Sequence, residues 1–189
     1  MTADAELIGR SLTEPEAFAR LFDRHADELF RYAARRLGGE LAEDVVGEVF
    51  LTAFRRRADY DRAREDARPW LYGIATRVIA QHRRAERRRT RALARLAADR
   101  PGGSEAAFDE RSAERVSAQQ LQPRLARALT RLNAAERDLL LLLAWADLSY
   151  EDAALALAVP VGTVRSRLHR LRAKVRRDLG PFVEERHSG

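Results

Sequence analysis

The sequence predicts an all-α protein of two small helical domains joined by a flexible linker, with a helix-turn-helix in the C-terminal domain. Three observations lead to this fold class. Apolar residues recur at helical spacing, and no segment alternates as a half-buried strand would. Most of the few glycines and prolines lie between these periodic segments, with a cluster of helix breakers at 101–104. A capped segment, a tight turn and a basic amphipathic segment follow one another over 148–172.

The N-terminal domain, expected over 1–96, should contain three helices. Thr13 and Glu16 have the spacing of a capping box that would open the first helix, and the glycine pair 38–39 would end it. The second helix is expected over 41–57. The third begins near Pro69, because the first turn of a helix accepts proline, and it runs into the basic stretch 82–91.

A change of composition near residue 99 predicts a linker over 97–120, where acidic residues follow the breaker cluster. Helical periodicity returns in the C-terminal domain, expected over 121–180, and a tail of 181–189 follows. Within this domain, Asn133 with Glu136 is predicted to cap one helix. Ser149 is predicted to cap the next, and Asp152 in its first turn is favoured by the helix dipole.

The chain has 189 residues, which is enough for one medium domain or two small ones. Its net charge is +6, and nearly all of its cations are arginines, because Lys174 is its one lysine. A basic chain favours an anionic partner, most often a nucleic acid, although a solvated basic surface has the same composition. The absence of cysteine excludes disulfides, thiol catalysis and cysteine-bound zinc.

Neither a membrane span nor a secretion signal is expected, and the protein is predicted to be cytoplasmic. The longest apolar run, 139–146, is far too short to cross a bilayer, and the N-terminus lacks a basic start followed by an apolar core. Enzymatic activity, a cofactor and a bound metal are not expected. The four histidines are dispersed, and the chain has no glycine-rich phosphate loop.

The segment from Val161 is predicted to be the recognition helix of the helix-turn-helix, the helix that enters the DNA major groove. At about 100° per residue, Val164, Leu168, Leu171 and Val175 share one edge and should pack inward. Side chains on the opposite edge would reach base edges, and the flanking cations would contact phosphates. The expected DNA contacts are Thr163, Arg165, Ser166, Arg167, His169, Arg170 and Lys174. An ordinary arginine-rich surface helix would have the same periodicity, but without the preceding capped helix and turn.

The helix around 42–54 has one apolar face and one mixed face. The apolar face, made by the valines together with Phe50 and Ala53, should be buried, whereas the mixed face presents acidic groups between exposed apolar ones. Such a mixture indicates a protein partner. The alternative is a helix that is buried on two sides within its own domain. The candidate contacts with the partner are Asp44, Gly47, Glu48, Leu51 and Arg55.

Two basic segments of the N-terminal domain, 55–64 and 82–89, are candidate nucleic-acid contacts. The first places an aromatic ring among cations, which suits single-stranded nucleic acid because bases stack and phosphates need cations. A solvated basic loop would have the same composition. The second segment is either a solvated helix end or a track for phosphates. Trp70 and Tyr72, by contrast, are expected in the core. The candidate residues are Arg56, Tyr60, Arg62 and Arg64 in the first segment, Arg83 and Arg84 in the second, and Arg77 between the two segments.

Four motifs carry a resemblance to a known family. They are Ala-Glu-Asp-Val-Val-Gly-Glu-Val-Phe-Leu at 42–51, Pro-Trp-Leu-Tyr-Gly-Ile-Ala at 69–75, Leu-Ser-Tyr-Glu-Asp at 148–152 and Val-Pro-Val-Gly-Thr-Val-Arg-Ser-Arg-Leu at 159–168. Together, in this order, they are highly specific. The chain resembles bacterial sigma-70-type RNA polymerase sigma factors of the extracytoplasmic function (ECF) group, over 17–91 and again over 125–179.

The resemblance implies a transcription initiation factor that binds core RNA polymerase and directs it to promoters. The face with Asp44, Glu48 and Leu51 would bind the clamp helices of the β′ subunit, and the 55–91 region would read and open the −10 element. The helix from Val161 would read the −35 element while its domain packs on the β flap. The linker would thread toward the active-site cleft and the RNA exit path. Family members are usually held inactive by an anti-sigma factor or another regulator, which adds a candidate partner.

Some positions depart from the family's pattern. Gly47 stands where the family usually has glutamine, which costs roughly 1 kcal/mol of helix stability and removes a polar contact. Ala158 replaces the customary turn glycine, and Asn133 replaces the customary proline. The loop 64–67 is more acidic than expected beside an unpaired strand. Replacing Gly47 by glutamine is therefore predicted to strengthen the binding of core polymerase.

Two other functions fit parts of the sequence. A stand-alone helix-turn-helix regulator would have the same C-terminal domain, but it would give the 42–54 helix no reason to combine acids with exposed apolar groups. Co-purification with core polymerase distinguishes it from a sigma factor. A protein-binding helical module would not need the basic outer face of the last helix, and a DNA affinity that depends on salt would exclude it.

Overall fold

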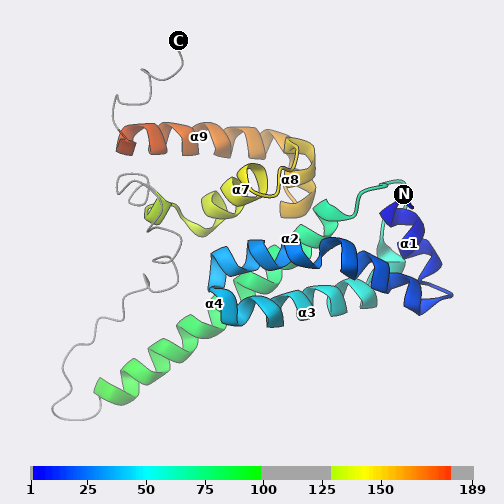
Figure 1. The fold of residues 1–189 in the computed structure, drawn as a ribbon. Helices are drawn as coiled ribbons and strands as arrows, with labels where there is room; N and C mark the ends of the chain where they lie inside the picture. The colour runs from blue at the N-terminus through cyan, green and yellow to red at the C-terminus, as the bar shows by residue number, and fades with distance from the viewer. Residues whose placement is uncertain (1, 99–128, 180–189) are drawn as a thin grey trace.

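The computed structural model describes residues 2–98 and 129–179, with side chains for 2–95 and 129–177. Within these ranges every regular element is a helix, which confirms the all-α fold (Figure 1). We call residues 2–98 the N-terminal unit and residues 129–179 the C-terminal unit. The elements are α1 (Asp4–Arg10), the 3-10 turn η1 (Pro15–Phe18), α2 (Ala19–Leu37), α3 (Gly39–Arg55), the 3-10 turn η2 (Arg57–Asp59), α4 (Arg68–Ala98), α7 (Ala134–Ala144), α8 (Tyr150–Leu157) and α9 (Val161–Leu179).

In the N-terminal unit, α2 and α3 form an antiparallel pair, and α4 packs against both (Figure 1). Each helix turns one apolar edge into the common core, because residues three and four positions apart lie on the same face. The predicted buried face of α3 is confirmed. Its members are Val45, Val46, Val49, Phe50 and Ala53, and none of them is more than 7% exposed. This packing fixes which side of α3 remains free for a partner.

The beginning of the chain differs from the prediction. Its first helix is α1, which the sequence pattern does not indicate, and the predicted capping box of Thr13 and Glu16 is wrong. The Thr13 hydroxyl donates to the carbonyl of Arg10, 3.2 Å away, and so belongs to the turn that ends α1. Pro15 then opens a separate 3-10 turn, and α2 begins only at Ala19.

The boundaries of the next helices agree with the prediction to within a few residues. Gly38 ends α2 with φ of 87°, a conformation that favours glycine, and α3 follows at once. Pro69 lies in the first turn of α4, which continues beyond 91 to Ala98. Most of the predicted linker of 97–120, the periodic segment 121–128 and the tail of 181–189 lie outside the described residues.

Both predicted helix caps of the C-terminal unit are confirmed. The Asn133 side chain accepts a hydrogen bond of 2.9 Å from the N–H of Glu136, and the Glu136 carboxylate accepts one of 2.8 Å from the N–H of Asn133. This is a complete capping box at the start of α7. The Ser149 hydroxyl likewise accepts a hydrogen bond of 3.0 Å from the N–H of Asp152 and caps α8.

The helix pair α8 and α9 forms the predicted helix-turn-helix. Ala158, between them, has a left-handed conformation with φ of 53° and ψ of 47°. An L-residue other than glycine pays about 1–2 kcal/mol for it. The inward edge of α9 agrees with the prediction, since Val164, Leu168 and Leu171 are buried and Val175 is half-buried.

The two units pack against each other. α8 packs more extensively on α4 than on α7 or α9. The backbones come closest at Gly73, where an added Cβ would lie 2.9 Å from the carbonyl oxygen of Ala156. Small residues therefore allow this contact, because any side chain at position 73 would meet the backbone of α8.

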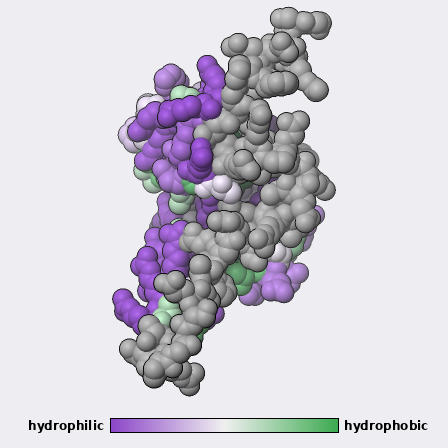
Figure 2. All heavy atoms as spheres, turned by 90° about the vertical axis from the view of Figure 1, so that its left-hand side faces the viewer, coloured by the Kyte–Doolittle hydropathy of each residue, from purple (hydrophilic) through white to green (hydrophobic). Residues whose placement is uncertain are grey.

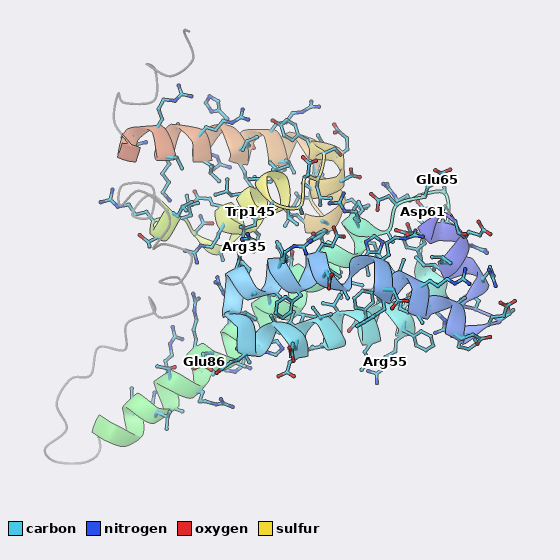
Figure 3. The ribbon with its side chains drawn as sticks, viewed as in Figure 1. Arg35, Arg55, Asp61, Glu65, Glu86 and Trp145 are labelled. Atoms are coloured by element: carbon cyan, nitrogen blue, oxygen red, sulfur yellow. The ribbon has the colours of Figure 1, made fainter. Side chains whose placement is uncertain are left out.

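Polar contacts surround this close approach. Arg68 at the start of α4 donates to the carbonyl of Ala146. The guanidinium of Arg35 on α2 lies 3.4 Å above the ring of Trp145, and Figure 3 shows the two side chains next to each other. A third contact joins Arg36 on α2 to Asp138 on α7. The described residues of the two units thus share one buried core and a polar rim.

Candidate nucleic-acid and partner interfaces

The outer face of α9 is open to solvent, as a recognition helix requires. Arg165, Ser166, His169 and Arg170 are exposed, whereas Arg167 and Thr163 are half-buried at the borders of the face. Figure 2 shows hydrophilic residues gathered over α9 and, separately, over the far part of α4. The buried edge of α9 fixes its rotation, so these side chains point outward together.

Intramolecular contacts divide the seven residues predicted for α9. The Lys174 ammonium donates to the carbonyl of Arg131 at 2.7 Å and to the carboxylate of Glu136 at 3.0 Å. It therefore ties α9 to the start of α7. Arg165 pairs with Glu151 on α8 at 3.4 Å, but both side chains are about two-thirds exposed, so the pair is weak. Ser166, His169 and Arg170 are the best placed for base edges.

The loop between η2 and α4 is held from inside. Tyr60 is 6% exposed, and its ring packs on Trp70 with centroids 5.0 Å apart. Its hydroxyl donates to the carbonyls of Arg64, at 2.7 Å, and Asp66, at 3.2 Å. Tyr60 therefore has no free face for a base in this structure. The sequence alone could not show which role Tyr60 has. A ring in a basic segment can stack on a base, or it can pack inside the protein and fix a loop.

A buried network ties α1 to this loop. Asp4 accepts hydrogen bonds from the Nε2 of His25 at 2.8 Å and from the N–H of Ala67 at 3.0 Å, and it pairs with Arg24. The N–H groups of Asp4 and Ala5 donate to the carbonyl of Glu65. These contacts fix the backbone at the C-terminal end of the exposed residues 61–66.

The charge of this network follows from its contacts. Burial alone would lower the pKa of His25, but hydrogen bonds and attraction from Asp4 and Glu28 outweigh it and raise the pKa to about 9. Burial alone would raise the pKa of Asp4, but His25, the N–H of Ala67 and Arg24 together lower it. The pair is therefore a buried imidazolium and a buried carboxylate at neutral pH.

The arginines predicted as contacts in the 55–64 segment remain exposed. Arg56 lies 3.9 Å from Asp59 and Arg64 lies 3.5 Å from Asp61, and all four side chains are about half exposed or more. Arg62 is exposed, and its Cδ lies near Gly9 of α1. Such exposed pairs are weak and leave these arginines available to phosphates.

One line of residues along α4 carries the remaining predicted cations. At 100° per residue, Gly73, Arg77, Ala80, Arg84 and Arg87 fall within about 40° of one line, opposite the face that enters the core. All three arginines are exposed. We call this line the arginine stripe. Arg83 borders the stripe, is half-buried and donates to the carbonyl of Arg36 at 2.7 Å.

The free face of α3 combines acids with an apolar side chain, as predicted. Asp44, Gly47 and Arg55 are exposed, and Leu51 is 49% exposed. Glu48 is half-buried, and its carboxylate forms a hydrogen bond of 2.9 Å with the Nε2 of His82 on α4. An added Cβ at Gly47 would meet nothing within 4 Å, so this position has room for a side chain.

The sequence pattern does not reveal the contact between the units. Asp138 and Trp145 look like ordinary residues of an amphipathic helix and its end, and Arg36 looks like a solvated cation. The structure buries Arg36 to 4% exposure and places Trp145 against Arg35. Among the described residues no group of three acidic, histidine or cysteine side chains could hold a metal, and no described helix is long and apolar enough to cross a membrane.

Comparison with known proteins identifies the family. The family pattern described as Sigma-70 region 2 matches residues 21–89, and the pattern described as Sigma-70, region 4 matches residues 123–175. The ECF RNA polymerase sigma factor SigL of Mycobacterium tuberculosis is 31% identical over 166 residues, which cover 87% of this chain and 90% of SigL. The match to the ECF RNA polymerase sigma factor BldN of Streptomyces coelicolor is 38% identical and spans only 32% of BldN.

Solved structures agree with this assignment. CnrH in complex with the cytosolic domain of CnrY has a TM-score of 0.64 and 26% sequence identity, over 93% of this chain and 96% of that chain. The sigma factor RpoE in complex with the anti-sigma factor NepR from Bartonella quintana has a TM-score of 0.57 at 21% identity, over 86% of this chain and 96% of that chain, and it shows the fold alone. The chain therefore belongs to the ECF group of sigma-70-type RNA polymerase sigma factors, which act in transcription initiation.

Proposed function

We propose that this sigma factor directs core RNA polymerase to promoters by reading the −10 element with its N-terminal unit and the −35 element with its C-terminal unit. The two units would correspond to the predicted domains of 1–96 and 121–180. One observation carries the proposal. Three exposed surfaces occur in the order of the family's motifs: the acidic and apolar face of α3, the arginine stripe of α4 and the outer face of α9.

The free face of α3 is the proposed contact with the β′ clamp helices. A half-exposed leucine surrounded by charged groups is typical of a protein interface, where a central apolar residue contributes much of the binding energy. Leu51 has this position, with Asp44, Glu48 and Arg55 around it. The contact between Glu48 and His82 joins α3 to α4, so the proposed polymerase contact and the proposed DNA-binding helix belong to one packed unit.

The arginine stripe and the loop 61–66 are the proposed −10 reader. Arg77 and Arg84 are exposed on the stripe, and the loop is fixed by Tyr60 and by the Asp4–His25 network. A preorganised loop binds an unpaired base with little loss of conformational freedom. Because Tyr60 is buried, base contacts would come from the exposed loop residues, with Arg56, Arg62 and Arg64 on phosphates.

The outer face of α9 is the proposed −35 reader. Ser166, His169 and Arg170 would reach base edges in the major groove, and the bordering cations would contact phosphates. A bidentate contact from Arg170 to guanine would contribute roughly 1–3 kcal/mol of discrimination. In this proposal the chain performs no catalysis, because polymerase supplies the chemistry, and it acts in the cytoplasm. An anti-sigma factor is a further candidate partner from the family resemblance.

A titration of core polymerase with the fluorescently labelled chain tests the polymerase contact. Leu51→Ala is expected to weaken binding about tenfold or more, the effect of losing roughly 1.4 kcal/mol at a central contact. Leu41→Ala is the matched control, because Leu41 is also an exposed leucine of α3, at 40% exposure. The polymerase contact is refuted if the wild-type chain does not bind, or if both variants bind equally.

Run-off transcription from a library of genomic promoter fragments tests the promoter reading. Transcripts are expected with core polymerase and the wild-type chain, and Arg170→Ala should reduce them at promoters that depend on the −35 element. A chain that binds promoter fragments but gives no transcripts with core polymerase would instead be the stand-alone regulator considered from the sequence.

A further inference from the structure

Arg36 is a buried cation whose carboxylate partner comes from the other unit. It is 4% exposed at the end of α2, and its Nη2 forms an ion pair with Oδ1 of Asp138 on α7. Its Nε and Nη1 have no hydrogen-bond partner among the described residues. Burying a guanidinium is costly unless its donors are satisfied. The site is therefore suited to an anion that offers more acceptor oxygens than this carboxylate uses.

Arg83 adds a second guanidinium from α4. Its Nη2 donates to the carbonyl of Arg36 at 2.7 Å, so the two residues are neighbours. Burial raises the pKa of Asp138, and attraction from Arg36, Arg83 and Arg137 opposes that rise. Two arginines of the N-terminal unit therefore attract one carboxylate, which belongs to the C-terminal unit. We call Arg36 and Arg83 the arginine pair.

The arginine pair lies beside the proposed DNA-binding face. Arg83 borders the arginine stripe, on which Arg84 and Arg87 are exposed. The C-terminal unit covers the beginning of the same stripe, because Gly73 belongs to it and contacts Ala156. A DNA strand that follows the stripe would therefore run against the C-terminal unit at the place where Asp138 meets Arg36.

We infer that Arg36 and Arg83 form a binding site for a phosphate of the promoter DNA backbone, and that the carboxylate of Asp138 occupies this site while the two units are packed together. Arginine suits both anions, because its planar fork of donors pairs with carboxylate and with phosphate oxygens. A phosphate has additional oxygens that can accept hydrogen bonds from Nε and Nη1 of Arg36, which have no acceptor here. The inference rests on the proposed function. It adds Arg36, which the sequence did not indicate as a DNA contact, to Arg83, which it did.

Promoter geometry requires that Asp138 leave the site. The −10 and −35 elements lie about 25 base pairs apart, as their names state, which is about 85 Å at 3.4 Å per base pair. A compact body of about 150 residues has a radius of gyration of only about 15 Å. The units must separate to reach both elements, and this separation frees the arginine pair at the time when DNA arrives. DNA and the C-terminal unit therefore compete for one site.

Removing the carboxylate should strengthen DNA binding by the free chain. The probe is a short fluorescein-labelled single-stranded oligonucleotide, followed by anisotropy without polymerase. Asp138→Asn is expected to tighten binding about fivefold or more, within the usual range of coupling between two sites. Asp147→Asn is the matched control, because it removes the same charge from an exposed residue of the C-terminal unit. Asp147 has φ of 50°, which asparagine accepts. Equal affinities of the two variants would overturn the inference.

Salt dependence identifies the cations that receive the phosphate. In the Asp138→Asn background, Arg36→Gln should abolish the gain and reduce the slope of log affinity against log salt by about 0.7, which corresponds to one phosphate contact on a single strand. Arg20→Gln is the control, since Arg20 is an exposed arginine of the same helix. Arg83→Gln provides a second variant of the site if Arg36→Gln melts early. An unchanged slope in both site variants would overturn the inference.

These measurements are independent of polymerase. If core polymerase does not bind the chain, the proposed function is refuted, and the oligonucleotide result still stands as a property of the arginine pair. If the run-off assay succeeds but Asp138→Asn and Asp147→Asn bind DNA equally, the inference alone is refuted. An oligonucleotide that binds none of the variants at low salt also contradicts it, because the freed site should then bind.

Discussion

The two units of the described chain are stabilised in different ways. The N-terminal unit buries large aliphatic side chains between three long helices, among them Leu21, Leu29, Leu71 and Ile79. The C-terminal unit is about half as long, and the buried residues of α8 are all alanines. α8 obtains much of its packing from α4 of the other unit.

The difference suggests that the N-terminal unit is stable by its own core, whereas the C-terminal unit depends in part on its neighbour. A short helical unit buries a small fraction of its surface and has little stability to lose. The proposed promoter binding separates the units. The N-terminal unit should then remain folded, whereas α8 would lose much of its packing. The following changes test this difference, beginning with the largest expected effect.

A matched pair of core substitutions should affect the units unequally. Leu21→Ala and Leu139→Ala each remove a fully buried leucine and are expected to cost about 2–5 kcal/mol. The N-terminal unit should remain folded with a lower melting temperature, whereas the C-terminal unit should unfold. Amide hydrogen exchange resolves the two units. Equal loss of protection in both units after either substitution would contradict the comparison.

The stability of the N-terminal unit should fall in alkali because of His25. Its pKa of about 9 in the folded state exceeds the ordinary value of 6.5. Protonated His25 therefore stabilises the folded state by about 3 kcal/mol below pH 6.5. This contribution disappears as the pH rises through 9. Asp4 has the opposite effect. Because its pKa is lowered, its contribution to stability is present above the ordinary value of 3.8 and is lost as the pH falls into the acid range.

Denaturant unfolding of His25→Gln at several pH values measures this effect. The variant should be less stable than the wild type at pH 6 and should approach it near pH 10. His169→Gln, on the exposed face of α9, is the control and should leave the profile unchanged. A wild-type profile that is flat between neutral pH and pH 10 would show that the Asp4–His25 network does not hold this charge.

A single methyl group at Gly73 should separate the units. The new Cβ would lie 2.9 Å from the carbonyl oxygen of Ala156, and such overpacking costs about 1–3 kcal/mol at the contact. Within α4, alanine should be better than glycine by about 1 kcal/mol. Gly73→Ala is therefore expected to stabilise the N-terminal unit and destabilise the C-terminal unit. Trp145 fluorescence, measured in a Trp70→Phe background, should report its separation from Arg35.

Gly39→Ala is the control for this change, because an added Cβ there meets nothing within 4 Å. It should leave Trp145 fluorescence unchanged. A Gly73→Ala chain with the same fluorescence and the same hydrogen exchange as the wild type would show that the two units do not depend on this close approach.

The smallest expected effect concerns α3 alone. Gly47→Gln should stabilise the N-terminal unit by about 1 kcal/mol, because glycine is a poor helix residue and position 47 faces open space. It should also strengthen the binding of core polymerase, as the family's pattern predicts, without changing the C-terminal unit. Thermal unfolding and the polymerase titration measure the two effects. Equal or weaker affinity would refute the second.

Sequence periodicity was sufficient to predict the structure where a helix has one strongly apolar edge. The buried face of α3, the caps at Asn133 and Ser149 and the inward edge of α9 all follow from local rules. α1 could not be predicted in this way. It has seven residues, too few to be stable alone, and it is held by contacts of Asp4 with residues far along the chain.

The candidate interfaces show the same division. The exposed face of α9 and the free face of α3 follow from helical spacing. Tyr60 could not be placed, because a ring among cations has the same sequence pattern whether it stacks on a base or on Trp70. The contact of Arg36 with Asp138 also has no local signal, since it joins residues 102 positions apart only after both units have folded and packed.

Permanganate reactivity of promoter thymines tests most directly whether this chain opens promoters. The experiment uses a promoter selected by run-off transcription, core polymerase and either the wild-type chain or the Arg77→Ala, Arg84→Ala double variant. Thymines around −10 should become reactive with the wild-type chain and remain largely protected with the double variant. Thymines that stay unreactive with the wild-type chain, or react equally with both chains, would contradict the assignment of the arginine stripe as the −10 reader.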